Sequence, residues 1–224
     1  MHKQTQMKKT VIFDMDGVIV DTEPVHHYAY HQHYKELNIP VTPELFATFT
    51  GQSTKNVYQI LKEKFGLEEE VNDLVLRKRA IFNEAFDTKP DLELISGVEN
   101  LIKDLHANGF ELVLASSASK STIDRVFNRF NLNQYFKAKV SGEDFPKSKP
   151  DPAIFIHAAS LSNSPKEECI VIEDSTNGIE AGVRAEIQVL GYVSHNTKRQ
   201  DLSKATWICE DFKAIDAKYI QQLS

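Results

Sequence analysis

From residue 96 onward the chain alternates short apolar segments with segments of helical periodicity, and this alternation constrains the fold more than any other feature. The predicted strands lie at residues 110–117, 137–142, 169–175, 187–192 and 207–209. Between them, apolar residues recur every three to four positions, as on the buried face of a helix. Apolar strands that alternate with helices favour a parallel sheet covered on both faces. The sequence therefore predicts an α/β domain with a Rossmann-like, three-layer core.

The stretch from residue 22 to about residue 90 differs, because it shows helical periodicity and no convincing strand. Residues 11–13 form an apolar strand that precedes this stretch and fits the same sheet as the later strands. We therefore predict an α/β core of residues 1–21 and 93–224. A small all-helical domain, residues 22–92, would be inserted after the first strand of that core.

Composition argues against several classes of function. The 224 residues carry a formal net charge of −6, whereas general nucleic-acid binding usually shows a basic excess. The two cysteines do not make a disulfide framework of the kind found in small secreted domains. No apolar run resembles a signal peptide or approaches the ~18 residues of a membrane span. We expect a cytoplasmic protein without nucleic-acid or membrane partners, for which a monomer would be a complete molecule.

Polar side chains follow the predicted strands at the points where each strand ends. In an open parallel sheet, ligands bind beyond the carboxyl ends of the strands, so these residues form the candidate site. They are Asp14 and Asp16, Ser116 and Ser117, Glu173, Asp174 and Ser175, and Lys149 before an intervening helix. Each motif alone is common in turns and helix caps. Their joint occurrence, each after its own strand, indicates a functional site.

Up to four carboxylates would converge on this edge of the sheet, where they would raise one another's pKa values. A divalent cation removes that conflict, and Mg²⁺ prefers oxygen ligands from carboxylates, water and substrate phosphate. Lys149 adds positive charge, and the serines add hydroxyl donors. Such a site suits a phosphoryl group, because phosphoryl transfer depends on positioning and charge neutralisation.

Taken together, the motifs resemble those of the haloacid dehalogenase superfamily of phosphotransferases, specifically its β-phosphoglucomutase-like subgroup. The resemblance covers nearly the whole chain. It rests on "DMDGVIVD" (residues 14–21), "LASS" (114–117), the lysine of "SKPDP" (149) and "VIEDSTNGIEAG" (171–182). The helical insert after the first motif is similar to the family's first type of mobile cap. The resemblance implies a Mg²⁺-dependent enzyme that acts on a small phosphorylated metabolite, most often a sugar phosphate.

The resemblance also implies a role for each acid. Asp14 would be the nucleophile that forms an aspartyl-phosphate. Asp16 would protonate the leaving oxygen as a general acid and then activate the next nucleophile as a base. Mg²⁺ would be held by the Asp14 carboxylate, the Asp16 backbone carbonyl and Asp174, with Glu173 nearby, directly or through water.

The remaining core motifs would bind the phosphoryl group itself. By resemblance, Ser116 and Lys149 would contact the phosphoryl oxygens, with Ser117 completing the hydroxyl-bearing motif. Lys149 would also offset the negative charge of the acids. Gly17 would let the backbone turn closely past the phosphoryl group, because glycine has no Cβ.

In the helical insert, His26 matches the family histidine that helps to orient the acid/base aspartate in the mutases. Ser53, in "TGQST", matches a cap loop that meets the substrate. The sugar-phosphate mutases carry an arginine just after that serine, whereas Thr54 and Lys55 follow it here. A lysine cannot form the bidentate fork of an arginine. The family's substrate-contacting cap lysine aligns nearest Arg79. These departures favour a phosphatase over a strict mutase.

Two further signals in the insert have simpler interpretations. His27 and His31 are i,i+4 partners on a predicted helix, a spacing found in metal sites. No third ligand is evident, so we interpret the four histidines of residues 26–33 as a solvated helix face. The basic cluster of residues 76–79 receives the same interpretation, with attraction of substrate phosphate as the second choice.

Three functional hypotheses follow. The first is a phosphatase, in which water attacks the aspartyl-phosphate. The second is a β-phosphoglucomutase, an isomerase that interconverts glucose 1- and 6-phosphate. The third is a non-catalytic binding protein of the same fold, against which the intact residues Asp14, Asp16, Lys149 and Asp174 argue.

Overall fold

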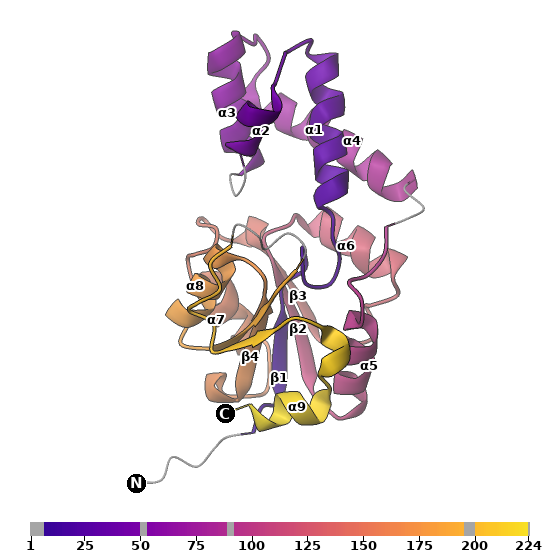
Figure 1. Ribbon diagram of the computed structural model, residues 1–224, viewed down its shortest axis with the longest axis vertical. Coiled ribbons are helices and arrows are strands. Elements are labelled where there is room, and N and C mark those ends of the chain that lie inside the picture. The colour runs from indigo at the N-terminus through magenta and orange to yellow at the C-terminus, as the bar shows by residue number, and fades with distance from the viewer. Residues whose placement is uncertain (1–6, 50–52, 89–91, 195–199, 224) are drawn as a thin grey trace. The chain divides into compact units, whose positions relative to one another are not determined.

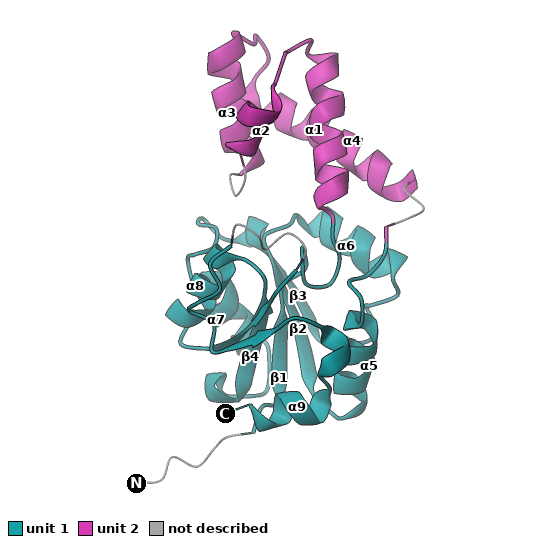
Figure 2. Ribbon diagram, in the orientation of Figure 1, with its two compact units in different colours: residues 1–21, 93–224 teal, residues 22–92 magenta. Residues whose placement is uncertain are grey.

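The computed structural model describes residues 7–49, 53–88, 92–194 and 200–223 (Figure 1). The chain divides into two compact units, residues 1–21 with 93–224 and residues 22–92 (Figure 2). In chain order, the strands and α-helices of the first unit are β1 (Thr10–Phe13), α5 (Val98–Ala107), β2 (Glu111–Ser116), α6 (Lys120–Arg129), β3 (Ala138–Ser141), α7 (Ala153–Ser160), β4 (Cys169–Glu173), α8 (Thr176–Arg184), β5 (Gln188–Tyr192), β6 (Trp207–Cys209) and α9 (Ala217–Gln222).

A six-stranded parallel sheet forms the centre of the first unit, in the order β3-β2-β1-β4-β5-β6. β1 lies between β2 and β4, with Phe13 opposite both Leu114 and Ile172. All five residues of β4 are buried, as expected for a strand covered on both faces. The predicted α/β class with a parallel sheet is therefore confirmed.

Helices cover both faces of the sheet, and the strand residues alternate between them. On one face, Ile12, Val113 and Val171 form a single apolar cluster with residues of α7 and α8. Their chain neighbours point to the opposite face, because side chains alternate along a strand. These neighbours are also buried, and α5 packs against β2. The result is the three-layer arrangement expected from the sequence (Figure 1).

Within its described residues the second unit is helical. Its helices are α1 (Glu23–Glu36), α2 (Pro43–Ala47), α3 (Thr54–Phe65) and α4 (Val71–Thr88). Both α1 and α3 pack against α4, around a core that includes Tyr58 and Leu61. Gly66 ends α3 in the left-handed conformation with φ 67°, which glycine adopts without steric cost.

The segments that flank the second unit lie beside each other within the first unit. Val20 and Leu94 form an antiparallel bridge, and the Ile95 amide donates to the Ile19 carbonyl at 2.9 Å. The insert therefore leaves and re-enters the first unit at one point. Part of the predicted second crossing, residues 89–91, lies outside the described residues. None of the helices in the described ranges is long and apolar enough to span a membrane.

The structure differs from the sequence-based expectations at α9 and at α1. Helix α9 was not expected, because its six residues are too few to show a periodic pattern, yet it buries Ala217 and Ile220. The second difference concerns the histidines of α1, which do not share one solvated face. His33 is buried, with its Nδ1 2.6 Å from the Tyr58 hydroxyl, so the helix turns this histidine into the core of the second unit.

Candidate active site

Asp14 is placed by the end of β1, and the following residues turn sharply. The Asp14 amide still donates to the Ile172 carbonyl of β4 at 3.0 Å, so the Asp14 side chain lies at the carboxyl end of the sheet. Gly17 adopts φ +83° and donates to the Val20 carbonyl at 2.9 Å. A Cβ on Gly17 would overlap the Asp174 carboxylate. Glycine is therefore required here both by the turn and by the close approach of a second acid.

Lys149 links the acids of this edge. Its Nζ donates to Asp14 Oδ1 at 2.5 Å, to Glu173 Oε1 at 2.9 Å and to the Ala115 carbonyl at 3.0 Å. The lysine side chain is 6% exposed, so these ion pairs are shielded from water. An ammonium group has three N–H donors, and each has a protein acceptor here. A phosphoryl oxygen could receive a hydrogen bond from Lys149 by replacing one of these acceptors.

Glu173 is the fixed end of this arrangement. Its Oε2 accepts from the amides of Asp174 and Ser175 at 2.8 and 2.9 Å, and from the Ser175 hydroxyl at 2.9 Å. Gly178, in the first turns of α8, leaves the space that the Glu173 carboxylate occupies. Three hydrogen bonds to Oε2 hold the Glu173 carboxylate in place, so its Oε1 fixes the position of the Lys149 ammonium group.

Asp174 is oriented by a residue that the motifs did not reveal. Ser194 follows β5, is buried, and donates its hydroxyl to Asp174 Oδ2 at 2.9 Å. Ser194 is the second residue beyond the predicted strand of residues 187–192, so a search for polar residues after each strand would have indicated it.

Burial and crowding shift the pKa values of the site in opposing directions. Burial raises the pKa of Asp14 well above its usual value, although Lys149 lowers it. Burial and then the Glu173 charge raise the pKa of Asp174 to about 7. Burial alone would lower the pKa of Lys149, but Asp14 and Glu173 outweigh it and raise the pKa above its usual value.

The donor set fits a hard divalent cation. Carboxylate oxygens of Asp14, Glu173 and Asp174, one from each residue, lie within 4.8 Å of one another. All three residues are buried, and their three carboxyl groups outnumber the single ammonium group of Lys149 beside them. Oxygen ligands at a site with excess negative charge are what Mg²⁺ prefers.

The other predicted core residues lie at or just beyond the ends of β1 and β2. Ser116 ends β2, is buried, and accepts from the Ala118 amide at 3.1 Å, whereas Ser117 is exposed. Asp16 is half-buried in the turn after β1. Its charge contributes to the raised pKa values of both Asp14 and Asp174.

The site residues predicted in the second unit either form hydrogen bonds within that unit or lie at least partly on its surface. Ser53 caps α3 by accepting from the Asn56 amide at 3.2 Å, and the Tyr30 hydroxyl lies 3.3 Å from Thr54 Oγ1. Lys55 is exposed, and Arg79 is half-buried on α4. Residues 50–52 of the "TGQST" loop lie outside the described residues.

A second residue missed from the sequence, Lys78, accompanies His26. Its Nζ lies 2.7 Å from His26 Nδ1 and 4.4 Å from the centre of the Tyr30 ring. Burial and then Lys78 hold the pKa of His26 well below its usual value. Lys78 is 3% exposed, so the predicted solvated basic face is wrong at this position. The sequence could have indicated its burial, because Lys78 lies four residues after Leu74 and four before Phe82, on the buried face of α4.

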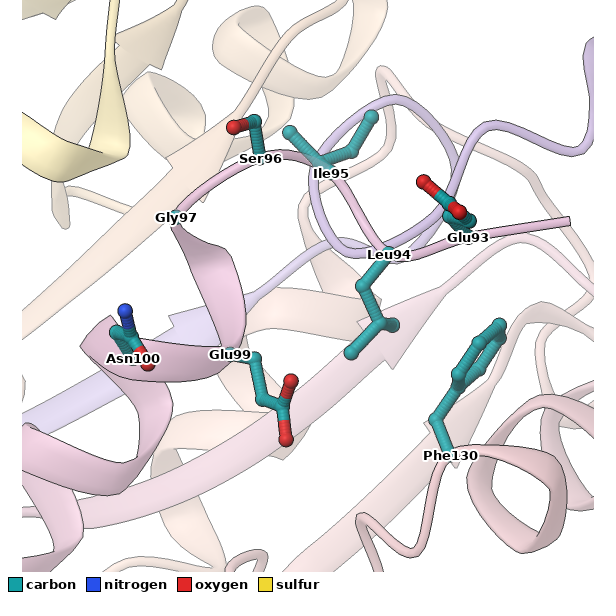
Figure 3. Close-up of a pocket in the computed structure, with 8 residues that line it drawn as sticks. All are labelled: Glu93, Leu94, Ile95, Ser96, Gly97, Glu99, Asn100 and Phe130. Atoms are coloured by element: carbon teal, nitrogen blue, oxygen red, sulfur yellow. The ribbon is translucent and has the colours of Figure 1, made fainter.

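A surface pocket of about 350 Å³ lies at the start of α5 (Figure 3). It is lined by residues 93–97, Glu99, Asn100 and Phe130. The lining shares no residue with the acidic cluster, so this pocket is separate from the candidate site.

We expect Gly178→Ala to impair the site from outside it. The added methyl would overlap the Glu173 carboxylate, and displacement of that anchor would move Lys149 away from Asp14. Overpacking of this kind costs about 1–3 kcal/mol of the free energy of unfolding. Urea unfolding and turnover rates measure both effects. The matched control is Asn177→Ala, at an exposed neighbour on α8, and activity equal to this control would show that Glu173 can shift harmlessly.

We expect Asp174→Asn to stabilise the protein in EDTA at pH 8. The raised pKa of Asp174 means that the folded state binds its proton more tightly than the unfolded state, so ionisation destabilises the fold as pH rises from about 4 to about 7. Removal of that charge should raise the free energy of unfolding by on the order of 3 kcal/mol at pH 8 and little at pH 4. Urea unfolding at both pH values, with Asp124→Asn as the surface control, measures this difference.

Comparisons with known proteins identify the family of this chain. Residues 11–192 match the family described as haloacid dehalogenase-like hydrolase. The chain is 30% identical over 192 residues to 6-phosphogluconate phosphatase of Escherichia coli strain K12, covering 84% of this chain and 85% of that protein. It is 29% identical over 192 residues to the phosphorylated carbohydrates phosphatase of Thermotoga maritima, covering 84% and 86%.

Among solved structures, the β-phosphoglucomutase of Clostridium difficile is similar, with a TM-score of 0.79, 26% identity and 97% of each chain covered. The family match spans both the turn that carries Asp14 and the segment that supplies Lys149 and Glu173. The chain therefore belongs to the haloacid dehalogenase-like hydrolase family.

Proposed function

We propose that the protein is a Mg²⁺-dependent phosphatase that hydrolyses a small sugar phosphate through a phosphoryl group held on Asp14. The observation that carries this proposal is the buried contact of Asp14 with Lys149, next to Asp174. A carboxylate fixed at 2.5 Å from an ammonium group is oriented for attack through its other oxygen. The two phosphatase relatives act on phosphorylated carbohydrates according to their names, which supports the same substrate class here.

In the first half-reaction, a carboxylate oxygen of Asp14 attacks phosphorus, and the bond from phosphorus to the sugar oxygen breaks. The Asp16 carboxyl donates its proton to that leaving oxygen. The Asp14 carboxylate, the Asp16 carbonyl and Asp174 would hold Mg²⁺, which when bound supplies positive charge against the phosphoryl oxygens and the crowded acids. Lys149 and the Ser116 hydroxyl would contact the phosphoryl oxygens, Lys149 by exchanging the Ala115 carbonyl for one of them.

In the second half-reaction, water attacks phosphorus and the bond to Asp14 breaks, which releases inorganic phosphate. The Asp16 carboxylate takes the proton of that water and so returns to its starting form. The two aspartates are two residues apart across a turn, which lets one serve as nucleophile while the other handles protons. Glu173 keeps Lys149 in place throughout, because its other oxygen is bound to two amides and a hydroxyl.

We further propose that residues 22–92 act as a cap that excludes bulk water during the transfer. The support is the position of the insert in the chain. It leaves the first unit next to the turn that carries Asp14 and Asp16, and the Val20–Leu94 bridge joins its two flanking segments. His26, Ser53 and the residues after Ser53 would then contribute to substrate selection.

The second candidate function is a β-phosphoglucomutase. The similarity to the Clostridium difficile enzyme favours it. Against it stands the absence of an arginine after Ser53, where Thr54 and Lys55 are found. In a mutase, a second hydroxyl of the sugar would take the place of water in the second half-reaction.

Asp14→Asn should abolish turnover without unfolding the protein. An amide is a poor nucleophile, so we expect phosphate release from a panel of sugar phosphates with Mg²⁺ to fall by at least about a thousandfold. The same panel should include an assay of glucose 1- and 6-phosphate interconversion with a sugar bisphosphate as activator. Phosphate release without interconversion supports the phosphatase, and the reverse supports the mutase.

The control for this variant is Asp124→Asn, the same substitution at an exposed carboxylate that pairs with Lys139. It should retain full activity. Both variants should keep the melting temperature within a few degrees of the wild type. Near-normal phosphate release by Asp14→Asn would remove Asp14 from the role of nucleophile and with it the proposed mechanism.

Ser194→Ala should weaken the binding of Mg²⁺ by about tenfold, because partners that orient a metal ligand typically contribute this much to affinity. The Ser194 hydroxyl fixes one oxygen of Asp174, and its loss frees that carboxylate to rotate. Calorimetric titration with MgCl₂ measures the affinity independently of turnover. The exposed Ser203→Ala serves as control, and an unchanged affinity in Ser194→Ala would show that Asp174 needs no such support.

A further inference from the structure

We propose that His27 and His31 form a two-histidine chelate for a divalent transition metal on the surface of α1. This site lies in the second unit, shares no residue with the acidic cluster and is independent of the proposed phosphatase activity. The ligand class is a borderline cation that prefers nitrogen, such as Ni²⁺, Cu²⁺ or Zn²⁺.

The two rings already face each other through the same nitrogen. The residues are four positions apart, so both side chains lie on one face of the helix. Their Nε2 atoms are 3.0 Å apart, with ring centres 4.1 Å apart and an angle of 50° between the planes. At this distance one Nε2–H donates to the other Nε2, and the shared proton occupies the place where a cation would bind.

The separation of the nitrogens fits metal coordination. Imidazole nitrogen binds such cations at about 2.0–2.1 Å, so two nitrogens at a right angle lie about 2.9 Å apart, and at the tetrahedral angle about 3.4 Å apart. The observed 3.0 Å is close to the right-angle value, which is typical of Ni²⁺ and Cu²⁺ sites. Binding needs only the exchange of the Nε2 proton for the ion. That ring then carries its proton on Nδ1, so a neutral pair releases none overall.

Packing holds both rings in this orientation. Phe46 of α2 lies 5.1 Å from the His27 ring at 83° and 5.2 Å from the His31 ring at 40°. His31 also meets Tyr34, edge to face, at 5.9 Å. Contacts of this kind reduce the freedom that two surface histidines would lose on binding a cation. His27 nevertheless remains exposed, which leaves an approach for the ion and for water as further ligands.

The other histidines of α1 do not join this pair. His26 is stacked on Phe82 at 4.2 Å with its Nδ1 against Lys78, and His33 is buried against Tyr58. Two protein ligands with water in the remaining positions make a weaker site than a closed structural zinc centre. Partial burial and the neighbouring His27 and Lys35 lower the pKa of His31, which favours the neutral ring that a metal requires.

Mg²⁺ is no competitor for this pair, because it is a hard cation that takes oxygen ligands. An excess of Mg²⁺ can therefore occupy the acidic cluster while the histidines are titrated. Failure of the proposed function would leave this proposal intact, and the reverse is also true, because the two sites share no ligand.

The test is calorimetric titration of the full chain with NiCl₂ at pH 7.5 in the presence of excess MgCl₂. We expect one binding event, weakened at least tenfold in His27→Ala and in His31→Ala alike. The matched control is His157→Ala, at a single exposed histidine on α7, which should bind as the wild type does. His2→Ala should also bind normally, which separates the helix site from the terminal histidine.

A second measurement guards against misfolded variants. Ni²⁺ should raise the melting temperature of the wild type and of His157→Ala but of neither helix variant, since a ligand stabilises only a fold that binds it. The proposal is overturned if the wild type does not bind Ni²⁺ below about 1 mM. It is also overturned if either helix variant keeps wild-type affinity, or if His2→Ala removes the binding.

Discussion

The buried ammonium group of Lys149 holds Asp14 and Glu173 together at the carboxyl ends of β1 and β4. These acids come from segments far apart in the chain, and without a cation between them their charges would repel. The Glu173 carboxylate cannot rotate away from Lys149, because two amides and a hydroxyl donate to its second oxygen. Asp14 keeps one oxygen on Lys149, and the proposed attack on phosphorus uses its other oxygen. The site is therefore preorganised at Glu173, whereas the Asp14 end can receive a phosphoryl group.

Close packing of backbone and acids is the other condition for this arrangement. Gly17 and Gly178 each occupy a position where a Cβ would overlap a carboxylate, of Asp174 and Glu173 respectively. Both acids are buried, and burial opposes ionisation. The chain thus accepts a cost in stability at this edge, which a bound cation and substrate would offset. A site destabilised in isolation is common in enzymes, because function requires charges that the fold alone would not favour.

The fold was largely predictable, because continuous apolar strands leave few alternatives to a covered parallel sheet. Residues 207–209 are so short that only their place in the alternation identified them, and they form β6. The strand-end rule also predicted the neighbours of Lys149, whose contacts with Asp14 and Glu173 the structure shows. What the sequence could not supply was side-chain direction. Ser194, two residues beyond a strand, belongs to no motif, and the sequence alone does not show that its hydroxyl points to Asp174.

The histidines of α1 show that residue type alone does not predict the role of a side chain. Four histidines within eight positions suggest one surface cluster, yet a helix distributes them over different faces. His33 is buried beside Tyr58, and His26 lies against Phe82 and Lys78, where burial lowers its pKa. Only His27 and His31, one turn apart, face each other through nitrogens near the surface. The period of the helix assigns different chemistry to identical side chains. One pair can bind a cation by exchanging a shared proton, while His26 is held neutral beside a buried lysine.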